Sequence, residues 1–317
     1  MSSHAFFHIA PACKSVYWHT PTRASLSLAH ELRSSGVSAR VDFILLLFVS
    51  CSIRSKLIEP FVHLQTDTYD LSLPNRDATD DLVTLDAANA VIKHGAAAKA
   101  ATITPDAARV SELNLKRQYR SPNATIRSKL DGTVVREGIA FRSLPRLIPH
   151  WNHPIVIARH GYGDQYAASD HAFDRPGSVE LTFKPDDGSE PQLHSVCHLP
   201  DHGGIALGMH NTFASIEKFA RTCFELSLSR QLPLCFGTKD TIIKQYDGAF
   251  REVFDQLYEA EYKERFEDAG LSYEHMLIDD LVARVLKSKG GFVWATKNFE
   301  GDVMSDLLAQ VRNAYLP

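Results

Sequence analysis

From about Ile53 onward, short apolar runs alternate with longer amphipathic segments, and this alternation constrains the fold more than any other feature of the sequence. The runs Leu234–Phe236 and Phe292–Ala295 predict buried strands. Each precedes a segment with apolar residues at helical spacing, residues 250–262 in the first case and Val303–Gln310 in the second. Because strands that alternate with helices are typical of sheets covered by helices, we predict the α/β class.

Turn residues mark the predicted elements of the first half. Leu82–His94 is predicted to be a helix closed by Gly95. Lys99–Ile103 predicts a short buried strand. The segment 104–106 that follows, Thr-Pro-Asp, predicts a helix start with a capping threonine, a proline at the first helical position and an acid in the first turn.

A β-rich insertion is predicted in the middle of the chain. Val179–Phe183 and Leu193–Cys197 have strand character and flank a turn sequence at 186–188, as in a hairpin. Ile155–Ala158 predicts a strand before this insertion, and Asn211–Gln231 predicts an amphipathic helix after it.

Bulk composition excludes several classes of protein. The net charge of −4 over 317 residues gives no basic footprint for nucleic acid, so we expect a metabolite as the partner. The apolar stretch Val41–Val49 falls short of the roughly 20 residues that span a bilayer, and we expect no membrane association. The 5 cysteines show no zinc-ligand spacing, and their odd number favours a reducing compartment. Neither common glycine-rich phosphate loop occurs.

Residues 1–40 have a composition of their own. They are rich in Ser, Ala, His and Arg, and Glu31 is their one acid. This composition resembles a mitochondrial transit peptide. A stretch without an evolved role, such as an alternative exon, is the other interpretation.

Three arginines form the first candidate site. Arg127, Arg136 and Arg159 lie on segments with few acids, and Ser121 and Asn123 precede the first of them. Guanidinium groups bind carboxylates bidentately, so the converging set would suit a di- or tricarboxylate. The alternative is that these arginines are solvated or salt-bridged.

Acidic residues form the second candidate site. Asp302 and Asp306 lie four residues apart, on one face of a predicted helix. Like charges at this spacing cost a helix roughly 0.2–0.5 kcal/mol, and a divalent cation such as Mg²⁺ or Mn²⁺ would reverse that cost. A surface acidic pair is the alternative. Asp279 and Asp280 form a second pair, which could simply be exposed.

Two further side chains are candidate proton carriers. Lys239 follows a predicted strand, and Tyr166 follows Arg159. A lysine near other cations has a lowered pKa and can exchange a proton near neutral pH. The alternatives are an exposed lysine and a packed tyrosine.

Eight segments, taken in order from about residue 54 to residue 310, resemble the eukaryotic NADP-dependent isocitrate dehydrogenases. They are NRDATDDLVTLDAA (75–88), ATITPDAARV (101–110), SPNATIR (121–127), GTVVRE (132–137), RHGYGDQY (159–166), TKDTIIKQYDG (238–248), YEHMLIDDLVA (273–283) and GGFVWATKNFEGDVMSD (290–306).

The resemblance implies oxidative decarboxylation of isocitrate to 2-oxoglutarate by a homodimer that uses NADP and Mg²⁺ or Mn²⁺. It also implies an isocitrate/isopropylmalate dehydrogenase-like fold. The implied layout is a non-family leader (1–53), a partial large domain (54–130), a small domain (131–163 and 213–310), a β-rich clasp (164–212) and a non-family tail (311–317).

The resemblance also implies a role for each matched residue. The substrate's carboxylates would be held by Ser121, Asn123, Arg127, Arg136 and Arg159. Tyr166 would protonate the enol carbon, and Lys239, reaching the site of the other subunit, would assist removal of the hydroxyl proton. The metal would be ligated by Asp302 and Asp306 together with Asp279 of the partner subunit. The nucleotide would be contacted by Thr102, Thr104 and Arg109, together with Lys287 of the partner subunit near the cofactor's extra phosphate.

Departures from the family pattern limit these expectations. Ala124, Arg284, Phe299 and Glu300 stand where the family has other residues. The family's opening strand and its adenosine-binding segment have no counterpart, so we expect truncation at both ends and no substantial NADP-dependent turnover. A non-catalytic dimerisation partner and an unstable fragment are the alternatives. The compartment is expected to be mitochondrial or cytoplasmic.

Overall fold

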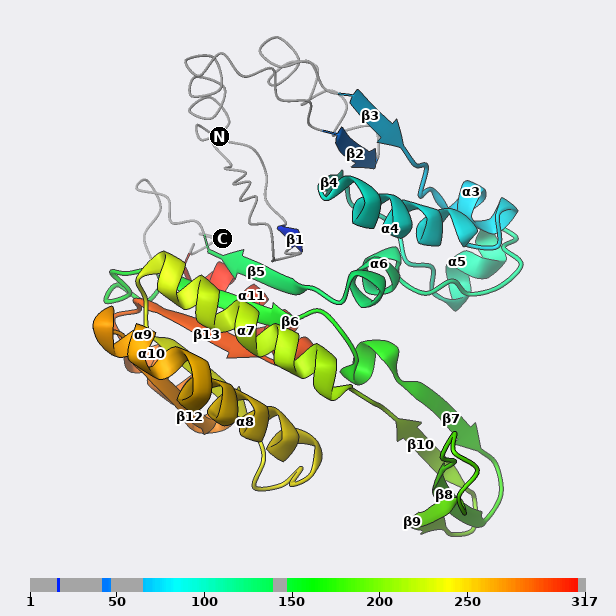
Figure 1. The fold of residues 1–317 in the computed structure, drawn as a ribbon. Coiled ribbons are helices and arrows are strands. Elements are labelled where there is room, and N and C mark those ends of the chain that lie inside the picture. Colours follow the sequence, from blue (N-terminus) through cyan, green and yellow to red (C-terminus); the bar gives the residue numbers. More distant parts are fainter. Residues whose placement is uncertain (1–15, 18–41, 47–64, 139–146, 313–317) are drawn as a thin grey trace.

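The computed structural model describes residues 16–17, 42–46, 65–138 and 147–312. Its centre is a six-stranded sheet (Figure 1). The strands, in spatial order, are β1 (Val16–Tyr17), β5 (Thr133–Glu137), β6 (Ile155–His160), β13 (Phe292–Thr296), β11 (Leu234–Thr238) and β12 (Tyr273–Leu277). The last four run parallel to one another, and β5 is antiparallel to β6. The α/β class is confirmed.

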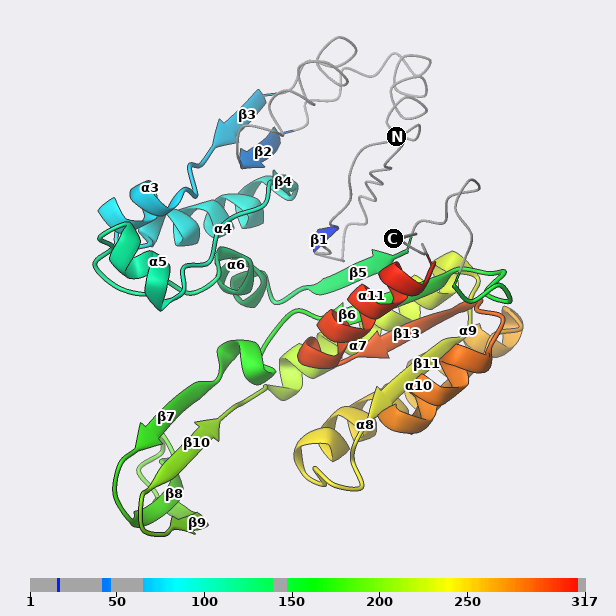
Figure 2. The same ribbon diagram turned by 180° about the vertical axis from the view of Figure 1, so that it is seen from behind.

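Helices cover both faces of this sheet. One face carries α7 (Phe213–Arg230) and α8 (Tyr246–Leu257), as Figure 1 shows. The other face carries α10 (Ile278–Lys287) and α11 (Asn298–Arg312), in front in Figure 2. Every residue of β6, β11 and β13 is buried, which is typical of central parallel strands covered on both sides.

The aromatic residues predicted to lie at helical spacing form the core of the α8 face. Phe250 and Phe254 lie on α8 and are fully buried. The chain continues through one π-helical turn (Tyr258–Tyr262) into α9 (Lys263–Asp268). The long helix predicted through these aromatics is therefore confirmed, with one wider turn inside it.

A second group of elements lies beside the sheet. It contains α3 (Leu73–Ala78), α4 (Leu82–His94), α5 (Ala107–Glu112), α6 (Pro122–Leu130) and a parallel sheet in the order β3 (Gln65–Thr68), β2 (Asp42–Leu46), β4 (Ala97–Lys99). Its core joins α4 to α6 through Ala87, Ala88, Ile126 and Leu130. The helix Leu82–His94 has the predicted bounds, and Gly95 closes it with a φ of 79°.

The β-rich insertion extends away from both groups (Figure 1). Strands β7 (Ser169–Phe173) and β10 (Gly204–Gly208) pair antiparallel, and β8 (Gly177–Phe183) pairs with β9 (Gln192–Leu199) as the predicted hairpin. Residues 164–212, here called the clasp, also contain the short 3-10 helix η1 (Asp164–Ala167).

Two details of the sequence prediction are wrong. The strand predicted at Lys99–Ile103 ends at Lys99, and residues 100–106 have no regular structure. The helix after them begins at Ala107, because Asp106 is its N-cap and accepts a hydrogen bond from the Arg109 main-chain N–H at 2.8 Å. Pro105 favours an extended residue before it, which keeps Thr104 outside the helix.

Other expectations concern residues outside the described ranges. The proposed leader (1–53) and the proposed tail (311–317) fall mostly there. Among the described residues, no helix is both long and apolar enough to span a bilayer.

Candidate functional site

Polar residues gather where the parallel strands of the central sheet end. Arg159 lies near the end of β6, Lys239 follows β11, and Lys297 follows β13. Asp279 follows β12 in the first turn of α10. The carboxyl ends of parallel strands share one edge, and ligands of open α/β sheets bind outside that edge.

A dense cluster of hydrogen bonds surrounds Asp302, on α11. Its Oδ1 accepts from Arg136 NH1 at 3.0 Å and from Arg159 NH1. Its Oδ2 accepts from the Tyr166 hydroxyl at 2.5 Å. Burial raises the pKa of Asp302, but these donors together hold it below its ordinary value. Asp302 is therefore ionised, and its charge is paired with those of Arg136 and Arg159.

Arg127, on α6, lies in the field of the same cluster. Burial lowers its pKa to about 10, with further lowering by the charges of Arg159 and Arg136. Burial also lowers the pKa of Arg159, whose side chain is 1% exposed. The three predicted arginines thus lie together, as expected of a carboxylate-binding set. Arg136 and Arg159 are also salt-bridged to Asp302, as the alternative interpretation expected.

The start of α6, the helix that carries Arg127, has further polar groups. Ser121 is the N-cap of this helix, and its side chain makes no capping bond. Asn123 Oδ1 is buried without a hydrogen-bond partner among the described residues. A buried polar atom of this kind marks a place where a ligand donor can bind.

Glycine at two positions permits the close approach of these elements. A Cβ atom on Gly301 of α11 would lie 2.6 Å from the Arg159 Cβ. One on Gly161 would lie 2.4 Å from the Gly132 carbonyl oxygen. Any larger residue at either position would displace the arginine-bearing strand or its neighbour.

Tyr166 is held between a cation and an anion. The Arg159 guanidinium carbon lies 4.6 Å from the centre of its ring, and its hydroxyl donates to Asp302. Burial raises the pKa of Tyr166, and the bond to Asp302 adds to that rise. The phenol therefore keeps its proton at neutral pH and can donate it.

The three predicted metal ligands do not form one group in this chain. Asp302 and Asp306 both face Arg136, whose NH1 lies 3.8 Å from Asp306 Oδ1. Asp279 instead accepts from Lys239 Nζ at 2.6 Å, which lowers its pKa. Within the described ranges, no three acidic, histidine or cysteine side chains come together as a metal site.

The predicted nucleotide contacts are spread over two regions. Thr102 Oγ1 accepts from Lys99 Nζ at 2.7 Å. Thr104 and Arg109, which follow within seven residues, are both exposed. Lys287 is exposed in the last turn of α10. Helices α5 and α10 lie on opposite sides of the molecule in both Figure 1 and Figure 2.

Sequence reasoning missed several polar residues at this edge. Lys99 is half-buried near Arg127, and burial, followed by the charges of Arg127 and Arg76, lowers its pKa to about 8. Asp164, Asp247, Lys297 and Asn298 are all buried. Lys99 lies two residues before the segment 101–110 and could have been noticed for that reason. The others lie inside the matched segments 159–166, 238–248 and 290–306, but no local pattern distinguishes a buried polar residue from an exposed one.

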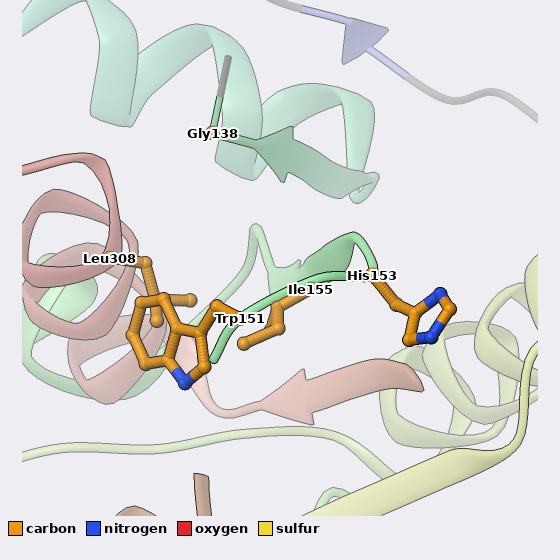
Figure 3. Close-up of a pocket in the computed structure, with 5 residues that line it drawn as sticks. All are labelled: Gly138, Trp151, His153, Ile155 and Leu308. Carbon is orange, nitrogen blue, oxygen red and sulfur yellow. The ribbon is translucent and has the colours of Figure 1, made fainter. Parts of the chain in front are cut away.

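Two hollows lie between β6 and α11. The larger, about 200 Å³, includes Arg136, Ser305 and Asp306 in its lining and opens beside the arginine cluster. The smaller, about 10 Å³, is lined mainly by apolar groups, including Trp151 and Leu308 (Figure 3). It has room for about one water, and His153 is the one titratable residue in its lining.

Comparison with known proteins gives a consistent result. The family model described as isocitrate/isopropylmalate dehydrogenase matches residues 48–314. The chain is similar to NADP isocitrate dehydrogenase 1 of Mycobacterium bovis, at 53% identity over 258 residues, 81% of this chain and 63% of that one. It is 54% identical to the cytoplasmic NADP isocitrate dehydrogenase of Dictyostelium discoideum over the same shares.

The NADP isocitrate dehydrogenase of Saccharomyces cerevisiae is 52% identical over 81% of this chain and 61% of its own length. The chain therefore spans about three fifths of the length of the relatives it matches.

Proposed function

The chain belongs to the isocitrate/isopropylmalate dehydrogenase family, and from that premise we propose that its arginine cluster binds isocitrate for NADP-linked oxidative decarboxylation to 2-oxoglutarate. The observation that carries this proposal is the convergence of Arg127, Arg136 and Arg159 on one buried edge of the sheet. Three guanidinium groups match the three carboxylates of isocitrate in charge and in hydrogen-bonding geometry.

The polar groups of α6 complete the proposed pocket. Ser121 and Asn123 lie at the start of that helix, six and four residues before Arg127. The Ser121 hydroxyl makes no capping bond and is suited to donate to a substrate carboxylate. The Asn123 side-chain oxygen, which has no partner among the described residues, is suited to accept from a substrate hydroxyl.

We propose Mg²⁺ or Mn²⁺ as the metal, held by Asp302 and Asp306. Their oxygen-only donor set suits these hard cations. When bound, the metal would supply Lewis-acid stabilisation of negative charge on the substrate. Asp302 is paired with Arg136 and Arg159 in this structure. Substrate carboxylates would take over these arginines and free Asp302 for the metal, so substrate and metal should each favour binding of the other.

Two side chains are the proposed proton carriers. Tyr166 keeps its proton through its raised pKa and is the proposed acid that protonates the substrate carbon. Lys239 is the proposed group that assists removal of the hydroxyl proton. NADP would accept the hydride, and Thr102, Thr104, Arg109 and Lys287 are its proposed contacts.

We propose a homodimer in which sites are shared between subunits. The clasp exposes apolar side chains that a lone subunit leaves in water: Leu181, Phe183, Leu193, Val196, Ile205 and Leu207. Exposed apolar side chains in this number, spread over both faces of the β8–β9 hairpin, favour an interaction site. Lys239 and Asp279 pair with each other apart from Asp302, as expected of residues that serve the other subunit's site. The same surface favours a second candidate function, non-catalytic pairing with another subunit.

Removing Arg136 should weaken isocitrate binding. Arg136→Ala deletes a charge-assisted contact, so we expect a loss of roughly 1.5–3 kcal/mol in binding free energy. Calorimetric titration of isocitrate in the presence of Mn²⁺ measures it. Arg230→Ala is the matched control. Arg230 also pairs with an acid, Glu137, which lies on the same strand as Arg136, but Arg230 is more exposed than Arg136. Equal affinity in Arg136→Ala and the control would remove Arg136 from the pocket.

Removing Asp302 should abolish stabilisation by metal. A ligand that binds only the folded state raises the melting temperature, so Mn²⁺ with isocitrate should stabilise the wild-type chain. In Asp302→Asn the part of this shift that Mn²⁺ adds to that of isocitrate alone should disappear, whatever the variant's own melting temperature. Asp268→Asn, an exposed acid at the end of α9, should keep the full shift. An unchanged shift in Asp302→Asn would exclude Asp302 as a ligand.

A further inference from the structure

Asp164 is a buried carboxylate without a role in the proposed reaction, and three donors converge on it. Its Oδ1 accepts from the Tyr246 hydroxyl at 2.6 Å and from Asn211 Nδ2 at 3.2 Å. Its Oδ2 accepts from the Asn298 main-chain N–H at 2.9 Å. Asp164 is 1% exposed. Only a carboxylate accepts all three bonds, because an amide of the same shape has a single acceptor oxygen.

The turn that carries Asp164 is held in an unusual conformation. Gly163 and Asp164 both have positive φ values, 66° and 54°. The Asp164 main-chain N–H donates to the His210 carbonyl oxygen at 3.1 Å. A Cβ atom on Gly163 would lie 2.6 Å from that same oxygen. A non-glycine residue in this region is sparsely populated and persists where its surroundings hold it.

Asn298 transmits this arrangement to the arginine cluster. Its Nδ2 donates to the Gly163 carbonyl oxygen at 3.3 Å, and its Oδ1 accepts from Arg159 Nε at 2.9 Å. Asn298 is also the first residue of α11, and Asp302 follows one turn later on the same helix. The bonds at Asn298 therefore determine how Arg159 and Asp302 lie relative to each other.

We propose that Asp164 is a positioning residue for the anion-binding edge: by fixing Asn298 it orients the Arg159 guanidinium against Asp302. The part of Arg159 in substrate binding rests on the proposed function, whereas the positioning itself rests on the geometry alone. Asp164 begins the clasp and Asn211 lies near its end, so their bond joins the two ends of the clasp, and Tyr246 joins α8 to the same carboxylate. Asp164 therefore binds donors from the clasp, from α8 and from α11.

Exchange of the Arg159 Nε proton with solvent tests the positioning without any ligand. In the ¹⁵N-labelled full chain, with the resonance assigned by its loss in Arg159→Lys, we expect slow exchange. We expect exchange at least about tenfold faster in Asn298→Ala and in Asp164→Asn, because the acceptor is removed or displaced. Tyr246→Phe deletes one donor to Asp164 and should act in the same direction if Asp164→Asn does not fold.

A matched control separates positioning from general loosening. Tyr273→Phe deletes another tyrosine–aspartate bond, from the Tyr273 hydroxyl to Asp255 Oδ1 at 2.9 Å, at the opposite end of α8. It should leave the Arg159 exchange rate unchanged. Unchanged exchange in the folded Asn298→Ala and Tyr246→Phe variants, or equal acceleration in Tyr273→Phe, would overturn the proposal.

Titration of isocitrate with Mn²⁺ then links positioning to binding. We expect roughly tenfold weaker affinity in Asn298→Ala, within the range seen when partners that orient a binding group are removed. Tyr273→Phe should bind as the wild type does. If the wild-type chain binds no isocitrate, the proposed function fails, and the proton-exchange result still decides whether Asp164 positions Arg159.

Discussion

Replacing Lys297 by methionine is expected to destabilise the fold by about 3–5 kcal/mol, because it leaves a buried charge without its partner. Lys297 Nζ lies 2.8 Å from Asp247 Oδ1, and the two side chains are 4% and 0% exposed. Asp247 Oδ2 also accepts from the Lys239 main-chain N–H at 2.7 Å. Burial lowers the pKa of Lys297, but Glu300 and Asp247 raise it above its ordinary value, so the lysine is charged at neutral pH.

Chemical denaturation of the full chain measures this loss. Lys263→Met is the matched control, because Lys263 pairs with Glu259 on the surface at 2.7 Å. Exposed pairs contribute about 0–1 kcal/mol. The double variant Lys297→Met with Asp247→Leu should recover part of the loss, since the fully buried Asp247 charge is then removed. It should not recover the bond to Lys239 or the pair with the part-buried Glu300. A loss in Lys297→Met no larger than in the control would show that the pair is not buried in solution.

Replacing Phe254 by alanine is expected to cost a similar amount, about 3–5 kcal/mol, through the cavity it leaves. Phe254 is fully buried. Its ring stacks on that of Phe236 at a centroid distance of 4.0 Å and meets those of Phe219 and Phe224 at 5.6 and 5.7 Å. It therefore joins α8 to β11 and to α7, and no neighbouring side chain can fill its volume without leaving its own contacts.

The control for this variant is Phe213→Ala on α7. Phe213 is 71% exposed, so its removal should change the free energy of unfolding by less than about 0.5 kcal/mol. The two variants are compared by denaturant midpoint at equal slope. Comparable losses in both would mean that the aromatic cluster does not form the core of this face.

Features set by local sequence were predictable. The bounds of Leu82–His94 follow from helical spacing and from Gly95, which adopts the left-handed conformation that closes a helix. The hairpin of β8 and β9 follows from its turn residues. The strand predicted at Lys99–Ile103 failed because Pro105 and the capping Asp106 determine the backbone there more strongly than three apolar side chains do.

Features set by distant contacts were not predictable from the residues alone. The arginines meet Asp302 across more than 140 residues, and Lys297 meets Asp247 across 50. A buried lysine or aspartate has the same local sequence signal as an exposed one. The family resemblance indicated Arg159 and Asp302, because those residues match its motifs. Asp164 and Asn298 lie in the same matched segments, but the resemblance implied no role for them, because they bind other protein groups.

The most direct test of the proposed function is a calorimetric titration of isocitrate into the wild-type 317-residue chain, with and without Mn²⁺. Because Asp302 is held by Arg136 and Arg159 in this structure, each ligand should free the groups that the other needs, so the two should bind cooperatively. We predict saturable binding that Mn²⁺ strengthens and that Arg159→Ala weakens. A folded wild-type chain that shows no saturable binding with Mn²⁺, or binding that Arg159→Ala leaves unchanged, would contradict the assignment of this edge to isocitrate.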